Sequence, residues 1–393
     1  MRWPAHTSEV VAWIVAAAWA WKLFEAARGL PQVPDLVAPE HDRWPEQNLH
    51  LTVIVPACNE EANVGACLQS LLAQDYPNLR ILAVDDRSTD RTASVIANLA
   101  STNPSRLELL RITSLPPLWL GKTHAMHVAA QIAIEQHQPD FLLFTDADII
   151  FRADALRRSL AQAEATQADH FVTAPTALMR RWDEGMLLGV FQVLGMWGVR
   201  SWKVSDAEAR DAVGVGAFNM LRTSAYLKVG GFESLRMQVV EDIGLGRRVK
   251  RLGLRQRIAF GRGLVNVHWA KGVSGLVGVM TKNTFAIFHY RPALVLFAIL
   301  FLRYFCIGPA VSLFYTPTRL PGVIGLTCIA LLYRMLRSRS AVPARYALLF
   351  PLGSAVFIYT LVLSMAKTWI QGGVRWRGTL YPLKDLRENS EPL

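Results

Sequence analysis

Residues 140–150, DFLLFTDADII, decide how the rest of the chain is interpreted. The apolar run 141–144 is bounded by polar residues, which is typical of a buried strand in a parallel or mixed sheet. Asp146 and Asp148 follow at the carboxyl end of this strand, where open α/β sheets bind their ligands. On a turn the two carboxylates can converge on Mg²⁺ or Mn²⁺, especially when a diphosphate supplies the remaining oxygens. By itself, such a pattern is more often a polar turn or a helix cap.

The segments around this strand alternate between strand and helix patterns. Apolar runs bounded by turn residues predict strands at 51–55, 80–84, 107–112, 141–145 and 171–174. Helical spacing predicts helices at 61–73, 89–99, 122–136 and 154–164. This alternation indicates an α/β fold with a mostly parallel sheet and helices on both faces.

The composition indicates a soluble domain bracketed by membrane segments. Hydrophobic residues make up 52% of the 393 residues and charged residues 19%, and the mean hydropathy is +0.22. These values are too apolar for an ordinary soluble enzyme and too charged for a pure transporter. The apolar excess lies near the two ends, so we expect transmembrane helices on both sides of the α/β domain.

The net charge of +11 limits the choice of partners. It would suit nucleic acid, anionic lipid or an anionic substrate such as a nucleotide diphosphate. No nucleic-acid motif is present and arginines cluster beside apolar runs, so we expect a membrane and a phosphorylated ligand as partners, and no nucleic acid. The four cysteines form no C-x-x-C pair, which fits a reducing compartment.

The expected organisation has six parts: an N-terminal transmembrane segment (1–28), a linker (29–48), a catalytic domain (49–270), an interfacial amphipathic segment (271–291), a C-terminal transmembrane region (292–368) and a basic tail (369–393). The first span contains Lys22, whose long side chain can snorkel to the interface. A cleaved signal peptide is the alternative for this segment.

The C-terminal transmembrane region has three candidate spans, at 293–314, 322–336 and 346–365. The segment 334–345 carries four arginines, so the positive-inside rule places it in the cytoplasm with the catalytic domain. Three complete crossings would then put the tail outside, although the tail is itself basic. We therefore expect one of the three spans to be re-entrant or interfacial.

Acidic residues also follow the first two strands. Glu60 and its neighbour Glu61 lie where the first strand gives way to a helix, and they could simply be helix starters. Asp85 and Asp86 end the second strand and could accept hydrogen bonds from a nucleobase or a ribose. Asp90, farther along, can cap the next helix.

Two further helix starts carry charged residues. Lys122 follows a glycine, so free backbone N–H groups and a point charge could meet a diphosphate there, although an isolated lysine is more often solvated. Asp242 follows Glu241 and could be a general base for an acceptor hydroxyl, or the pair could only compensate the helix dipole. Upstream, the glycines of the stretch 213–219 would allow a close approach of chain or substrate.

Taken in order, these motifs resemble glycosyltransferase family 2 on a GT-A fold. They are P-x-x-N-E-E (56–61), V-D-D-x-S-x-D-x-T (84–92), G-K before a helix, D-A-D, G-x-G-A-F (214–218), V-G-G-F-E (229–233) and an E-D helix. The resemblance covers residues 52–252, about half of the chain. The membrane segments and the tail sequence VRWRGTLY (374–381) are similar to the membrane-bound, lipid-directed branch, and within it to the hopanoid (hopene)-associated subgroup.

The resemblance implies a role for each matching residue of the donor site. Asp86 would hold the nucleoside with Asp85 beside it, and Glu60 and Lys122 would contribute to donor binding, with Lys122 on the diphosphate. Asp146 would serve both the donor and the metal.

The resemblance also implies the metal and the base. Asp148 would be the more direct ligand of a divalent cation, Mg²⁺ or Mn²⁺, and Asp242 would be the catalytic base. His268 could complete the metal shell, or it could be a hydrogen-bonded core histidine.

The expected function is inverting transfer of a single sugar from a nucleotide sugar, with a UDP-sugar as the expected donor, to a lipid acceptor that could be hopanoid-related. The expected location is the bacterial inner membrane, multi-pass, with the catalytic domain facing the cytoplasm.

One alternative is a processive polysaccharide synthase-like transferase, but its Q-x-x-R-W-type motif has no match here. A nucleotidyltransferase would carry a Gly-rich first loop. A non-enzymatic membrane subunit would not need Asp146, Asp148 and Asp242 together.

Overall fold

The computed structural model describes residues 3–391 and divides the chain into two compact units. We call the first the helical unit; it comprises Met1–Val33, Ala177–Trp202 and Trp269–Gln371. We call the second the sheet unit; it comprises Pro34–Thr176, Lys203–His268 and Gly372–Leu393. The domain ranges expected from the sequence stay predictions.

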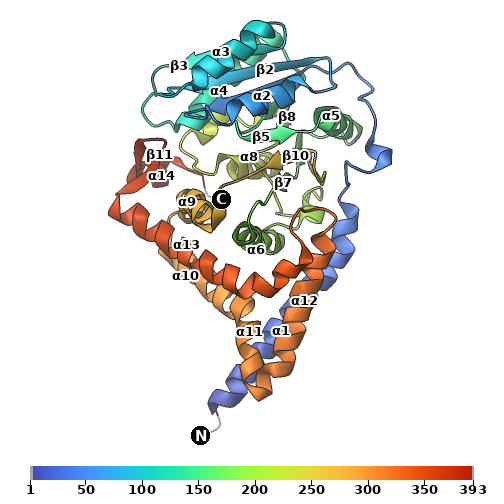
Figure 1. Cartoon of the computed structure of the whole chain (residues 1–393), viewed down its shortest axis with the longest axis vertical. Helices are drawn as coiled ribbons and strands as arrows, with labels where there is room; N and C mark the ends of the chain where they lie inside the picture. Colours follow the sequence, from blue (N-terminus) through green and yellow to red (C-terminus); the bar gives the residue numbers. More distant parts are fainter. Residues whose placement is uncertain (1–2, 392–393) are drawn as a thin grey trace. The chain divides into compact units, whose positions relative to one another are not determined.

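The sheet unit is built on a seven-stranded sheet in the order β3-β2-β1-β4-β8-β6-β9 (Figure 1). Its strands are β1 (Leu51–Ala57), β2 (Leu79–Asp86), β3 (Leu107–Ile112), β4 (Phe141–Phe144), β6 (His170–Thr173), β8 (Asn219–Arg222) and β9 (Gln256–Ala259). All neighbours pair in parallel except β8, which runs antiparallel to β4 and β6. The expected mostly parallel sheet is therefore confirmed, although the sequence patterns missed two of its strands, β8 and β9.

Strand β1 lies at the topological switch point of the sheet. It pairs in parallel with β2 on one side and with β4 on the other, so that Leu51 is opposite both Leu79 and Phe141. In open α/β sheets the crevice at such a point, outside the carboxyl ends of the strands, is the usual ligand site. The loops that follow β1, β2 and β4 all reach this edge.

Helices of the sheet unit follow the expected alternation. They are α2 (Val64–Leu72), α3 (Thr92–Thr102), α4 (Gly121–Ile132), α5 (Ala155–Ala165), α7 (Thr223–Lys228) and α8 (Glu241–Arg251). Helix α4 continues through one π-helical turn, Ala133–His137, which accounts for the longer helix expected from the sequence.

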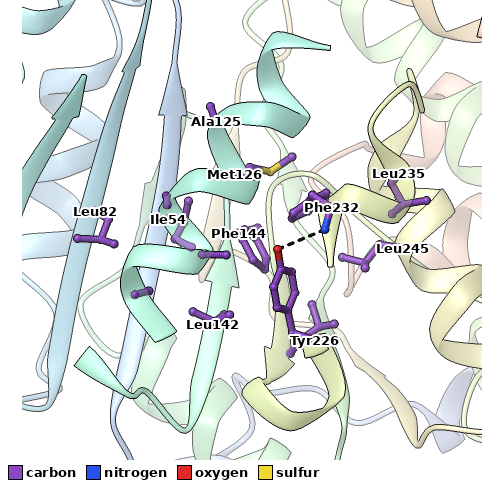
Figure 2. Packing of buried hydrophobic residues seen from close by; sticks show 14 of the residues in the cluster. Ile54, Leu82, Ala125, Met126, Leu142, Phe144, Tyr226, Phe232, Leu235 and Leu245 are labelled. Carbon is purple, nitrogen blue, oxygen red and sulfur yellow. Dashed lines mark hydrogen bonds between the residues drawn. The ribbon is translucent and has the colours of Figure 1, made fainter. Parts of the chain in front are cut away.

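One face of the sheet is covered by α4 and by the segments that follow β8. Figure 2 shows Ile54, Leu82 and Phe144 of the strands packed with Met126 of α4 and Phe232. The rings of Phe144 and Phe232 meet edge to face, with their centroids 4.8 Å apart. This cluster fixes the strand ends relative to the start of α4.

The opposite face of the sheet is buried as well. Val53, Ile81 and Leu143 alternate with the residues of the first cluster, and all three are fully buried. Helices on both faces therefore cover the sheet, as the near-continuous apolar strands predicted.

A small second sheet, in the order β5-β10-β7, follows the main one. Its strands are β5 (Ile149–Phe151), β10 (Val265–Val267) and β7 (Thr176–Ala177), and β5 pairs antiparallel with β10. Because β5 starts directly after Asp148, the segment 145–148 is a connection between two strands and does not start a helix.

The last part of the sheet unit is a hairpin of β11 (Gly373–Trp376) and β12 (Thr379–Pro382), followed by α14 (Leu383–Asn389).

The segment expected as a linker packs on the sheet unit from Pro34 onward. Leu36 donates its backbone N–H to Phe260 at 2.8 Å, and Phe260 donates to Pro34 at 2.8 Å. Arg157 of α5 forms an ion pair with Asp42 at 2.9 Å. These contacts hold this stretch as an ordered strap along the sheet unit.

The helical unit contains α1 (Trp3–Gly29), α6 (Trp182–Gly198), α9 (Gly272–Ile287), α10 (Pro292–Phe301), α11 (Gly308–Val311), α12 (Thr316–Leu336) and α13 (Phe350–Ile370). Within residues 3–391, four helical stretches are long and apolar enough to cross a membrane: His6–Gln32, Pro292–Phe314, Thr316–Leu336 and Ala344–Ile370. Apolar helices near both termini are thus confirmed. Figure 1 shows α1 and α12 side by side, whereas α13 packs against α9 and α6.

The interior of the helical unit corrects one expectation about α1. Lys22 does not snorkel: it is buried, with Nζ 2.7 Å from Glu25 and 3.3 Å from the Met196 carbonyl oxygen. Glu25 lies one turn farther along the helix and neutralises the lysine inside the unit. Trp19 is also buried, and it donates its indole N–H to the Phe305 carbonyl at 2.7 Å.

Candidate active site

The loops after β1 and β2 interlock to form one rim of the crevice. Asn59 accepts the backbone N–H of Thr89 at 2.8 Å and donates its own backbone N–H to Ser88 at 3.0 Å. Asn59 and Arg87, each just beyond its strand, have φ of 55°, a left-handed conformation in which Asn is tolerated well. The hydrogen bonds hold both loops in this geometry.

Asp86 and Asp85 at the end of β2 are both buried. Asp86 is neutralised by Arg87, whose Nε and Nη2 lie 2.7 and 3.1 Å from its two oxygens. Asp85 Oδ1 is buried without a hydrogen-bond donor among residues 3–391. Since an unsatisfied buried oxygen is costly, this atom is suited to an N–H or O–H group supplied by a ligand.

The start of α4 lies directly against this pair. A Cβ on Gly121 would lie 2.4 Å from Asp86 Oδ2 and 2.6 Å from Arg87 Nη2, so only glycine fits. The backbone N–H of Gly121 donates to the hydroxyl oxygen of Tyr381 at 3.2 Å. The C-terminal hairpin thus already uses the N–H of Gly121, and contact of this helix start with a diphosphate stays a prediction.

Lys122 is mostly buried between two carboxylates. Its Nζ lies 2.5 Å from Asp146 and 2.5 Å from Glu241. Burial lowers its pKa, but the two carboxylates outweigh burial and the net shift is upward, so the lysine stays charged. The alternative of a solvated lysine is wrong, and its contact with a diphosphate stays a prediction. Glu241, which the sequence indicated only as a helix starter, is its second partner.

Asp146 and Asp148 lie on the connection between β4 and β5. Asp146 is partly exposed, with 38% of its side chain accessible. Burial, followed by the negative charges of Asp146 and Glu60, raises the pKa of Asp148 to about 7. Three carboxylates therefore crowd this turn, and a divalent cation relieves such crowding.

These side chains fit a cation that also takes oxygens from a diphosphate. Among residues 3–391, no group of three or more His, Cys, Asp or Glu side chains is arranged to hold a metal ion by itself. Two carboxylates together with phosphate oxygens match the way in which Mg²⁺ is usually bound with nucleotides. His268 comes directly after β10, and its role as a third ligand stays a prediction.

Asp242 is held in place at the start of α8. Its Oδ2 accepts the backbone N–H of Gly216 at 2.9 Å and its Oδ1 accepts that of Ile243 at 2.8 Å. Burial and the charge of Glu241 raise the pKa of Asp242 to about 6, against the lowering effect of Lys122. A carboxylate with this pKa is mostly ionised at neutral pH and remains basic enough to accept a proton.

The glycines of the 213–217 loop allow that loop to pass close to both Asp146 and Asp242. A Cβ on Gly214 would lie 1.7 Å from the Asp242 carbonyl oxygen, and one on Gly216 would lie 2.8 Å from Asp146 Oδ2. It is the chain itself that makes the expected close approach. The loop thereby connects Asp146 with Asp242.

The structure thus brings most of the predicted residues to one edge of the sheet. Direct contacts connect Asp86 to Gly121, Lys122 to Asp146, and Gly216 to Asp242. Glu60 acts on Asp148 through its charge. Arg87 and Glu241 were missed as site residues, although each is the direct sequence neighbour of a predicted one.

Comparison with known proteins first defines the class of fold. A solved mannosyltransferase from Pyrobaculum calidifontis, in complex with GDP-Man and Mn²⁺, superposes with a TM-score of 0.51 and covers 92% of this chain and 99% of that one. At 18% sequence identity this likeness shows the fold alone, which is GT-A-like with apolar helices near both termini.

The sequence comparisons then identify the domain. Residues 52–221 match the model of Glycosyl transferase family 2. The 4,4'-diaponeurosporenoate glycosyltransferase of Staphylococcus aureus (strain USA300) is 26% identical over 198 residues, which are 50% of this chain and 50% of that protein. The chain spans about half the length of the curated relatives it matches. Residues 52–221 are therefore similar to glycosyltransferase family 2 domains.

Proposed function

We propose that this protein transfers a single sugar from a nucleotide sugar to a lipid acceptor, with inversion at the sugar carbon that reacts. The observation that carries the proposal is the connected set Lys122, Asp146, Gly216 and Asp242 at the switch point of the sheet. It joins a charged site for a diphosphate to a held carboxylate of raised pKa, which are the two functions that a sugar transfer requires.

The nucleoside is proposed to bind at the end of β2. The unsatisfied Oδ1 of Asp85 would accept a nucleobase N–H or a ribose hydroxyl. Asp86 is already neutralised by Arg87, so this side of the site would receive the nucleoside without a further cation. A UDP-sugar is the proposed donor.

The diphosphate is proposed to lie against the turn after β4. Asp146 and Asp148 would hold Mg²⁺ or Mn²⁺, with His268 as a further candidate ligand. The metal, when bound, supplies positive charge that stabilises the leaving nucleoside diphosphate. Lys122 adds a second positive charge from the start of α4.

Asp242 is proposed to activate the acceptor. It would accept the proton of an acceptor hydroxyl while the hydroxyl oxygen forms a bond to the reacting carbon of the sugar and the bond to the diphosphate breaks. The hydrogen bonds from Gly216 and Ile243 fix the orientation of its carboxylate. One displacement of this kind inverts the configuration of that carbon.

The acceptor is proposed to be a membrane lipid, and a hopanoid-related lipid in particular. Four apolar helical stretches among the described residues support a position at a membrane. The staphylococcal relative is a 4,4'-diaponeurosporenoate glycosyltransferase, which by its name acts on a lipid-like acceptor.

We also propose a cytoplasmic sheet unit at the bacterial inner membrane. The hairpin that follows α13 contacts Asn59 and Glu60, so the chain must return to the side of the sheet unit after an even number of crossings between 269 and 371. The stretches Pro292–Phe314 and Thr316–Leu336 would cross out and back, and α13 would lie in the interface. This arrangement keeps both the arginine-rich segment 334–345 and the basic tail in the cytoplasm.

The proposed reaction is tested with full-length protein in membranes. Labelled UDP- and GDP-sugars are incubated with extracted lipids, including hopanoids, with Mg²⁺, Mn²⁺ or EDTA, and the lipid product is analysed by mass. The expected result is a metal-dependent lipid that carries one added sugar. A polymeric product would favour a polysaccharide synthase, and no transfer from any donor would refute the proposal. Reporter fusions at residues 48, 340 and 391 should all report cytoplasmic positions.

A further inference from the structure

The C-terminal hairpin contacts the rim of the candidate active site at two points. Arg377 forms an ion pair with Glu60, and its Nη1 lies 3.5 Å from the Asn59 carbonyl oxygen. Tyr381 accepts the N–H of Gly121 at 3.2 Å. The hairpin therefore spans from the loop after β1 to the start of α4, across the end of β2.

The backbone at Arg377 is unusual for an arginine. Trp376 pairs with Thr379, which leaves Arg377 and Gly378 as a two-residue turn with φ of 49° and 82°. Two positive φ values indicate a type I′ turn, in which Asn-Gly is strongly preferred. A left-handed conformation is unfavourable for a residue such as arginine, because its Cβ comes too close to the backbone. An arginine held in this position suggests that its side chain has a function.

The charge of Arg377 acts on the crevice itself. Burial raises the pKa of the Cys58 thiol and so does Asp86, whereas Arg377 and Arg87 lower it. Arg377 thus acts on the same thiol as Asp86. Glu60, its ion-pair partner, in turn acts on Asp148. The Arg377 side chain is 43% exposed, so a ligand can approach it from the solvent side.

We propose that Arg377 is a donor-binding residue whose guanidinium contacts the diphosphate of the nucleotide sugar, with Tyr381 fixing the hairpin on the start of α4. The inference rests on the proposed function. Lys122 is shared between Asp146 and Glu241, and the Gly121 N–H is occupied by Tyr381, so the hairpin adds a further N–H donor beside the positive charge of Lys122. A guanidinium suits this role because it offers two parallel N–H groups to phosphate oxygens.

The test compares three variants of the full-length protein in detergent. Arg377→Asn removes the charge but places the residue preferred in this turn, so the hairpin should fold at least as well. Arg377→Lys keeps the positive charge but lacks the planar guanidinium group with its two parallel N–H donors. Arg375→Ala is the matched control, because Arg375 is an exposed arginine of the same hairpin.

Binding of UDP, GDP, uridine and guanosine is measured by calorimetry with Mn²⁺ present. We expect Arg377→Asn to weaken binding of the diphosphate about 10- to 100-fold and to leave nucleoside binding unchanged. Arg377→Lys should lose less affinity for the diphosphate, and Arg375→Ala should bind it as tightly as the unaltered protein does.

The outcomes separate the two proposals. If the unaltered protein binds neither UDP nor GDP and transfers no sugar, the proposed function fails. If it binds one of them and both Arg377 variants bind equally well, the role of Arg377 is refuted while the proposed function stands. If Arg377→Asn weakens binding of the nucleoside as much as binding of the nucleoside diphosphate, Arg377 supports the rim and does not contact the diphosphate.

Discussion

The two sides of the candidate active site differ in how their charges are balanced. At the end of β2, Asp86 is paired with Arg87, and hydrogen bonds to Asn59 fix the neighbouring loop. At the turn after β4 and the start of α8, four carboxylates share one lysine: Asp146, Asp148, Glu241 and Asp242, with Lys122. The first side is preorganised as it stands, whereas the second retains excess negative charge.

This difference teaches which part of the site needs a cation. A nucleoside brings hydrogen-bond donors and little charge, so a neutralised and rigid side suits it. A diphosphate brings negative charge, and it would add to the crowding unless a divalent cation came with it. We therefore expect changes on the acidic side to affect catalysis and metal dependence, and changes on the β2 side to affect nucleoside binding and stability.

The largest expected effect is that of removing the proposed base. Asp242→Asn keeps the shape of the side chain but cannot accept the proton, so kcat should fall about 10²- to 10⁴-fold. Binding of the nucleoside diphosphate should change little. The measurement is single-turnover sugar transfer beside calorimetry, with Glu208→Gln, an exposed acid of the sheet unit, as control. Turnover that persists would place the base elsewhere.

The metal should act on one side of the site only. EDTA should weaken UDP or GDP binding and leave nucleoside binding intact, because only the diphosphate shares the cation with Asp146 and Asp148. Asp148→Asn should weaken metal binding by at least about 10- to 100-fold, because the loss of a direct ligand should cost no less than the loss of an outer-shell partner. A metal titration followed by calorimetry measures both effects. An equal loss of nucleoside binding would contradict the separation of the two sides.

The pH dependence should report the crowding on the acidic side. Asp242 acts as a carboxylate, whose fraction grows as the pH rises, so with its pKa at about 6 the value of kcat/KM should rise through pH 6 and then level off. Glu241→Gln removes a neighbouring negative charge, which should lower that pKa and move the rise to lower pH. A rise that stays in place would show that Glu241 does not tune the base.

The smallest expected effect lies on the preorganised side. Asn59→Ala loses its hydrogen bond to Thr89 and places alanine at positive φ, which should cost about 1–2 kcal/mol of stability. Asn59→Gly also loses the hydrogen bond, but glycine adopts positive φ readily, so this variant should lose less stability. Thermal unfolding of both variants measures the difference, and equal losses would mean that the conformation of the loop is not strained.

The sequence by itself determined the type of each local element and the chemistry at its end. Short apolar runs such as 141–144 define strands, and the residues that follow them, among them Asp86, Asp146 and Asp148, necessarily reach one edge of a parallel sheet. Glycine before Lys122 and acids before a basic helix likewise identify helix starts. These features depend on neighbours a few residues away, so a linear pattern reveals them.

Only the tertiary structure decided which of these ends touch. Lys122 pairs with Glu241 and Asp146 because α8, β4 and α4 meet at the switch point, and no local pattern encodes that pairing. Arg377 returns to Glu60 across most of the chain, although the sequence indicated only a basic tail. Lys22 lies in the interior beside the Met196 carbonyl oxygen of α6, where snorkelling was expected. Contacts between distant segments depend on the order in which strands and helices pack, and packing is decided by the whole buried surface.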